Sequence, residues 1–152
     1  MPTVTTDALW LGLAAAAGGC IAMQAAANGA LKQQLGDGRY AAFFSICGTI
    51  LTAVAFMLVT RPTPPAAAAI RAAPWWNWIG GPLGALIVLA GATLTPRLGA
   101  AAFITAVIAG QVICSLLFDH YGIMNVPQQG LTASRILGGL MVFAGVMLVR
   151  YG

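Results

Sequence analysis

Five long apolar stretches, separated by isolated charged residues, decide what this chain can fold into. The stretches that we expect to be helical cover residues 8–31, 40–60, 75–95, 98–118 and 133–151. Each comes close to the about 20 residues that a helix needs to cross the hydrocarbon core of a bilayer. Backbone polar groups in lipid must be satisfied within the segment, which favours α-helices. We therefore predict an all-α integral membrane protein, with a single transmembrane domain over residues 1–152.

The charge content supports a membrane environment. Only 7% of the residues are charged, against about 25% in an ordinary soluble domain. The seven basic and three acidic residues fall singly between apolar runs, where they anchor helix ends at lipid headgroups rather than form a patch that binds nucleic acid. The three cysteines are scattered and lack CxxC spacing, which predicts neither a metal site nor a disulfide framework.

The distribution of basic residues gives almost no instruction about orientation. Five spans put the termini on opposite sides of the membrane, with three basic residues on the N-terminal side and four on the other. They are Arg61, Arg71 and Arg135 on the first side, and Lys32, Arg39, Arg97 and Arg150 on the second. Because such differences orient membrane proteins, the chain either inserts both ways and pairs as an antiparallel homodimer, or takes its orientation from a weak bias or a partner protein.

Three amide side chains lie deep within the predicted spans. Gln24 and Asn28 are spaced i, i+4 and share one helix face, and Gln111 lies near the middle of the fourth span. Uncompensated amides in lipid are costly, so they should face a cavity or another helix. They either bond between helices as structural contacts or line a substrate-binding site. Gln111 is the expected partner of Gln24 or Asn28 in both cases.

The second span adds a polar stripe of Ser45, Thr49 and Thr52. Hydroxyl groups in membrane helices commonly bond to their own backbone, so Ser45 and Thr49 are weaker candidates for the same site.

The third span opens with tryptophans. Trp75 and its neighbours predict an interfacial belt, with a cation-binding aromatic box as the alternative that makes Trp75 a site candidate. Gly80 and Gly84 form a GxxxG motif that favours close helix contact. Pro82 predicts a kink that would let the helix hinge.

Charged and small residues mark the last two spans. Asp119 ends the fourth span and opposes the helix dipole, so it needs a cationic partner, and Arg135 is the first choice. With His120, these residues form either an ion pair that fixes the loop or a gate that titrates. Gly138 and Gly145 share one face of the fifth span, which predicts a dimer interface.

No enzyme motif is present, and we expect neither catalytic residues nor a cofactor. The sequence has no HExxH, no GxSxG and no phosphate-binding glycine loop. No Asp or Glu lies deep in a span, although proton-coupled transporters usually need one.

As a set, the motifs resemble the drug/metabolite transporter superfamily, and within it the short bacterial five-helix branch called YdcZ-like, whose function is unknown. The resemblance covers nearly the whole chain. It rests on Gln24-x-x-x-Asn28-x-x-Leu31, Phe44 with Gly48-Thr49, Pro74-Trp75-Trp76-x-Trp78-x-Gly80-Gly81, Pro96-Arg97-Leu98-Gly99-Ala100-Ala101, Gly110-Gln111, Asp119-His120-Tyr121-Gly122 and Arg135-x-x-Gly138.

The resemblance implies a bacterial inner-membrane transporter. That branch is similar to the small multidrug resistance proteins, which work as antiparallel dimers, and it includes members predicted to insert both ways. The last helix, with Gly138 and Gly145, looks like the dimerising helix of those proteins. The first helix departs from them, because those proteins carry a membrane-buried glutamate in helix one, whereas this helix carries Gln24 and Asn28 and no acid. Proton–cation exchange therefore does not carry over.

We expect a secondary transporter of a small solute that works by alternating access as an inverted homodimer. A small dimeric channel and a non-transporting membrane subunit or scaffold are the alternatives. The expected partners are a second copy of the chain, the lipid bilayer and an unknown solute.

Overall fold

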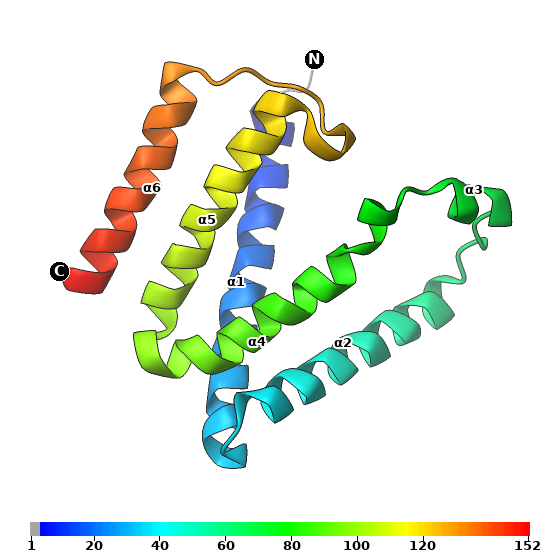
Figure 1. Ribbon diagram of the computed structural model, residues 1–152, viewed down its shortest axis with the longest axis horizontal. Helices are drawn as coiled ribbons and strands as arrows, with labels where there is room; N and C mark the ends of the chain where they lie inside the picture. The colour runs from blue at the N-terminus through cyan, green and yellow to red at the C-terminus, as the bar shows by residue number, and fades with distance from the viewer. Residues whose placement is uncertain (1–3) are drawn as a thin grey trace.

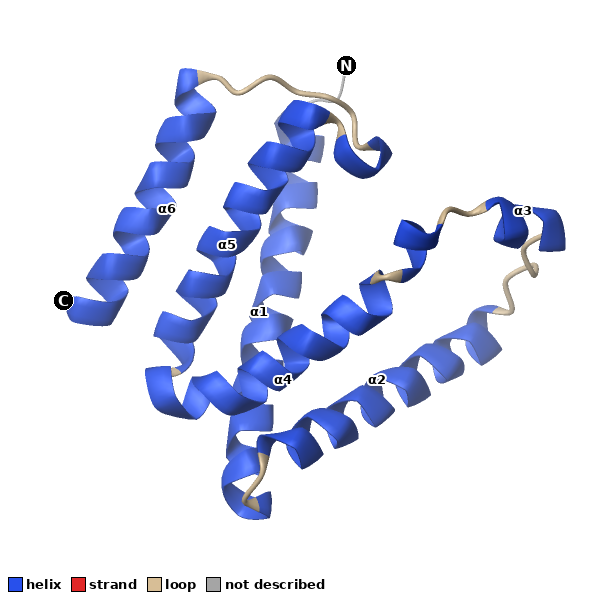
Figure 2. Ribbon diagram, viewed as in Figure 1, coloured by secondary structure: helices blue, strands red, loops and turns tan. Residues whose placement is uncertain are grey.

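The computed structural model describes residues 4–152, with side chains from residue 7 onward, and these residues contain helices but no strand (Figure 2). The long helices are α1 (Val4–Leu35), α2 (Gly38–Thr60), α4 (Gly80–Leu98), α5 (Ala100–Tyr121) and α6 (Ala133–Tyr151). Shorter ones are α3 (Ala67–Ala72), η1 (Trp75–Trp78) and η2 (Ile123–Asn125). Five helical segments in the described residues are long and apolar enough to cross a membrane, as the sequence predicted.

The long helices form two groups that meet at one end (Figure 1). In one group α6 packs against α5, and in the other α2 packs against α4. The C-terminal half of α1 joins them, packing chiefly against α4 and α2 and only lightly against α5. The α2–α4 pair leans away from the other helices, so the molecule is open between its arms (Figure 1).

The buried residues gather where the helices meet, and most of them are small. Ala41 of α2 and Ala92 of α4 are 0% exposed, and the largest buried side chain is Phe103 of α5. A Cβ atom added to Gly38 would lie 2.6 Å from Thr93 Cγ2. Small residues let helix backbones approach closely, and van der Waals packing is the main attraction between helices in lipid. The junction is therefore held by contact between alanine and glycine surfaces.

Away from the junction the helices are exposed. Every residue from 7 to 21 in the first half of α1 is exposed. Within the most apolar window of each span, at most 17% of the residues are buried, and in α6 none are. The single chain therefore presents most of its apolar surface to lipid or to another protein.

Several helices extend beyond the predicted ends. α1 continues to Leu35 because Lys32 and the glutamines after it favour helix, and it ends before Gly36, whose φ is +77°. α5 continues through Asp119 to Tyr121 and ends at Gly122, which adopts a left-handed conformation. At both positions a glycine, rather than the charged residue before it, ends the helix.

The prolines act differently from the prediction. Pro82 lies in the first turn of α4, where a missing N–H costs little, and the predicted helix is interrupted just before it, at Ile79 between η1 and α4. Residues 96 and 97, which lie between the predicted spans, are also helical, and Pro96 lies within the last turn of α4. Only Gly99, with φ +86°, separates α4 from α5. Residues 75–78 form the 3₁₀ turn η1 rather than the start of an α-helix.

Candidate transport site

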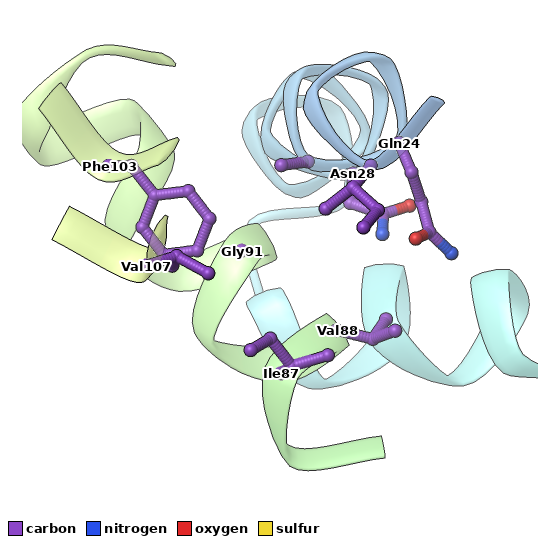
Figure 3. Close-up of a pocket in the computed structure, with 9 residues that line it drawn as sticks. Gln24, Asn28, Ile87, Val88, Gly91, Phe103 and Val107 are labelled. Atoms are coloured by element: carbon purple, nitrogen blue, oxygen red, sulfur yellow. The ribbon is translucent and has the colours of Figure 1, made fainter. Parts of the chain in front are cut away.

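A cluster of three polar side chains joins α1 to α2 near the junction of the helices. Asn28 Nδ2 donates a hydrogen bond of 3.1 Å to Ser45 Oγ, and Gln24 Nε2 donates one of 3.4 Å to the same atom. Asn28 is only 6% exposed. Figure 3 shows both amide side chains projecting from one side of α1 towards the ribbons of the α2–α4 pair. The i, i+4 spacing on α1 therefore produces a shared polar site.

A small cavity lies beside this cluster, where α1, α4 and α5 meet (Figure 3). Gln24 and Asn28 line it on one side, and Gly91 and Phe103 line it on the other. Its volume is about 20 Å³, which is enough for about one water molecule. A larger solute can reach the amides at this point only after the helices separate.

Thr49 lies one turn beyond Ser45, and its hydroxyl proton is used in a hydrogen bond within its own helix. Its hydroxyl donates to the backbone carbonyl of Ser45 at 3.1 Å, as hydroxyls in membrane helices commonly do. Thr49 also lines an open cleft between α2 and α4, together with Gln24. Its hydroxyl oxygen thus remains a possible acceptor for a ligand in that cleft.

Lys32 is a further polar residue near the cluster, and it was not among the sequence candidates. Its Nζ donates to the backbone carbonyl of Thr93 at 3.1 Å, which joins α1 to α4. Asn28 and Lys32 are spaced i, i+4, so the helix periodicity already placed Lys32 on the face of the cluster. Its charge, taken alone, indicates only the end of the first span.

Gln111 does not join the other two amides, which corrects the expected pairing. It is exposed and lines a separate cleft of about 470 Å³ between α1 and α5. The α1 wall of that cleft is formed by small residues that include Gly18 and Gly19. Gln111 thus lies opposite the first half of α1, around Gly18 and Gly19, whereas Gln24 and Asn28 belong to the second half.

Trp75 also lies away from the cluster. Its side chain is 73% exposed and stacks edge-on against Trp76, and it lines none of the cavities described here. An aromatic pair at the start of a span matches the interfacial belt better than a binding box.

The ion pair predicted from the sequence is present at the end of α5. The guanidinium of Arg135 contacts the Asp119 carboxylate and also donates to the backbone carbonyls of Gln129 and Gly130, at 3.3 and 3.5 Å. His120 takes no part in this pair, and its Nδ1 is buried without a hydrogen-bond partner among the described residues. This arrangement fixes the loop between α5 and α6, and a gating role for it stays a prediction.

The glycines of α6 differ in their surroundings. Gly139, not one of the two predicted, packs against Leu116 of α5, where an added Cβ would lie 3.3 Å from Leu116 Cδ1. A Cβ added at Gly138 or Gly145 would meet nothing within 4 Å. The face expected to contact a second copy is therefore free in the single chain.

Five apolar spans and an uncharged polar cluster define a small multi-pass α-helical membrane protein. Residues 9–148 match the family described as "Putative inner membrane exporter, YdcZ", and the chain belongs to this branch of the drug/metabolite transporter superfamily. It is a multi-pass protein of the inner membrane. No curated protein and no solved structure matches it.

Proposed function

We propose that the protein is a secondary transporter of a small solute, with its binding site at Gln24, Asn28 and Ser45. The observation that carries this proposal is the shared acceptor, Ser45 Oγ, which takes hydrogen bonds from both amides between two helices. Hydrogen-bonding groups within a span face a cavity or another helix because lipid cannot satisfy them. A solute that offers its own donors and acceptors can replace these bonds at little cost.

The open architecture supports an inverted homodimer as the working unit. One chain is packed at the junction and splayed at the other end, where residues 7–21 are exposed. An inverted copy would place its packed end beside the open end of the first chain. The unoccupied face of α6, with Gly138 and Gly145, offers a surface for close helix contact. Inverted pairs around a midplane site are a common plan for transporters that use alternating access.

The proposed mechanism is based on the contrast between the small cavity beside Asn28 and the open clefts between the helices. The cavity beside Asn28 holds only about one water molecule, whereas the clefts between the helices are open. Separation of α1 from α2 would break the bonds to Ser45 and expose the buried Asn28 to solute. In an inverted dimer, closure of one copy and opening of the other would expose the site to each side of the membrane in turn.

Substitution of the cluster tests the site. We expect the double variant Asn28→Ala/Ser45→Ala to abolish uptake or efflux in cells that overproduce the protein. Asn77→Ala is the matched control, because Asn77 is an exposed amide in η1. Gln111→Ala alone should have a smaller effect, since Gln111 lines another cleft. Unchanged transport in the Asn28/Ser45 variant would remove this site assignment.

Orientation is tested by labelling one cysteine at the C-terminus. The three native cysteines are free and two are exposed, so a cysteine-less background should fold. We expect Gly152→Cys in that background to be labelled about equally from both sides of intact membranes. Labelling from one side only would mean a parallel assembly or a partner protein, and would contradict the inverted dimer.

A further inference from the structure

The cleft between α2 and α4 has the dimensions of a ligand site. Its volume is about 560 Å³, within the about 300–1,000 Å³ typical of small-molecule pockets. Ile46 and Ile50 of α2 form one wall, and the first three turns of α4 form the other. Ile50 is 57% exposed, so the cleft opens sideways towards lipid.

Glycines keep this cleft open. Gly80, Gly81 and Gly84 line it, and a Cβ added to any of them would meet nothing within 4 Å. The GxxxG motif therefore does not bring two helices of this chain together, and the close helix contact that it favours stays a prediction. At the other end of the same helix pair, Gly38 lies tightly against Thr93. The pair is closed at the junction and open where the α4 glycines lie.

The polar groups of the cleft belong to Gln24 and Thr49. Gln24 Nε2 donates to Ser45, and among the described residues nothing donates to its carboxamide oxygen. The Thr49 hydroxyl uses its proton on the Ser45 carbonyl and keeps its lone pairs. Both groups can therefore accept hydrogen bonds from a ligand, while the isoleucines and glycines offer an apolar surface to the rest of it.

No charged residue lines the cleft in the part of the chain that the structure describes. Arg39 lines an adjoining cleft, and its guanidinium is already paired with Asp37 at 2.6 Å. An ion placed in an apolar site without a partner loses its hydration and gains nothing in return.

Building on the transport function proposed above, we infer that the α2–α4 cleft is a lateral entry site for an uncharged amphiphile. Its hydrogen-donating head would bind Gln24 and Thr49, and its apolar body would lie along the glycine face of α4. The transported solute would then reach the amide cluster from the lipid rather than from water, since Gln24 belongs to both the cleft and the cluster.

Photolabelling of the purified full-length protein in liposomes tests this inference. Three alkyl diazirines of the same chain length would be compared, with a primary-amide, a trimethylammonium and a carboxylate head. Mass spectrometry would locate the labelled residues. We expect the amide probe to label the segments around Ile46, Ile50 and Ile87 about tenfold more than either charged probe, since about 1.4 kcal/mol of lost binding is tenfold.

Gly84→Leu should fill the cleft and lower amide labelling by about fivefold or more. Gly48→Leu is the matched control, because Gly48 of α2 also has open space around it but lies outside the cleft. Thr49→Val provides a second variant that keeps the side-chain shape and removes the hydrogen-bond acceptor. It should lower the ratio of labelling by the amide probe to labelling by the charged probes. Equal labelling by all three probes, or labelling unchanged by Gly84→Leu, would overturn the inference.

These outcomes are separate from the fate of the transport function. Amide labelling in the cleft without any transport that depends on Asn28 would leave the cleft site and remove the transporter. Transport that depends on Asn28, together with equal labelling by the charged and uncharged probes, would keep the transporter and remove the cleft site.

Discussion

Asn28 Nδ2 lies 3.1 Å from Ser45 Oγ, and this hydrogen bond joins α1 to α2 within the membrane. Asn28 is nearly buried, whereas Ser45 is half-buried. The pair therefore stands at the boundary between the packed junction and the open part of the molecule. The bond therefore adds to the packing that resists separation of α1 from α2.

A double-mutant cycle should detect this bond. We expect Asn28→Ala and Ser45→Ala to be coupled by about 0.6 kcal/mol, and by no more than about 1.7 kcal/mol, the range found for hydrogen bonds between membrane helices. The measurement is the free energy of unfolding in mixed micelles for both single variants and the double variant. Asn28→Ala with Asn77→Ala is the uncoupled control. If the two substitutions changed the free energy of unfolding additively, the result would contradict a hydrogen bond between Asn28 and Ser45.

Gly38→Ala should destabilise the junction by about 1–3 kcal/mol, the usual cost of overpacking. The added methyl would meet Thr93 Cγ2 at 2.6 Å, and Thr93 is held in place because its hydroxyl donates to the Leu89 carbonyl at 2.8 Å. Gly48→Ala in the same helix should be neutral or stabilising by up to about 1 kcal/mol, since alanine is the better helix former. Thermal unfolding in micelles measures both, and equal effects would show that the contact is not tight.

Arg135→Gln should open the loop over residues 122–132 to proteases. The wild-type guanidinium bonds to Asp119 and to two loop carbonyls. We expect the free energy of opening this loop to fall by about 1 kcal/mol, the upper end for partly exposed ion pairs. The loop should then be cleaved about fivefold faster. Arg135→Lys should fall between, because an ammonium cannot make all these bonds. Arg71 is an exposed arginine in α3, so the loop of the Arg71→Gln variant should be cleaved by proteases at the wild-type rate.

The start of α2 should depend on pH through Asp37. Hydrogen bonds from the Arg39 side chain and backbone N–H lower the pKa of the Asp37 carboxyl below its usual 3.8. A carboxyl with a lowered folded pKa stabilises the fold above its unfolded pKa, and this contribution is lost as the pH falls through the folded value. Amide exchange at Arg39 should therefore quicken below about pH 4. In Asp37→Asn the same amide should show no such change with pH.

The sequence was sufficient to predict features that depend on one helix at a time. The five spans follow from hydropathy, and the bounds of α6, residues 133–151, agree with the prediction. Thr132 caps α6 by accepting a hydrogen bond from the Arg135 amide, as expected from its residue type. The ion pair of Asp119 with Arg135 was predictable because both residues flank one short loop.

Features that depend on which helices meet were not predictable. The i, i+4 spacing placed Gln24 and Asn28 on one face of α1 but did not identify Ser45 as their shared acceptor. Gln111 was equally polar and equally central, yet it lies opposite Gly18 and Gly19 in the first half of α1 and so lines another cleft. The GxxxG motif of Gly80 and Gly84 favours helix contact but does not show that these glycines line an open space in the single chain. Hydropathy records preference for lipid and does not record the angles between helices.

The alanine and glycine junction inverts the usual rule for where a protein tolerates change. In a soluble core, shortening a large side chain leaves a hole and is the damaging step. Here the buried side chains of Ala41 and Ala92 are single methyl groups that can hardly be shortened, and most of the large apolar side chains already face outward. Sequence drift towards bulkier residues is therefore the hazard at the junction, while the outer surface can exchange one large apolar residue for another freely.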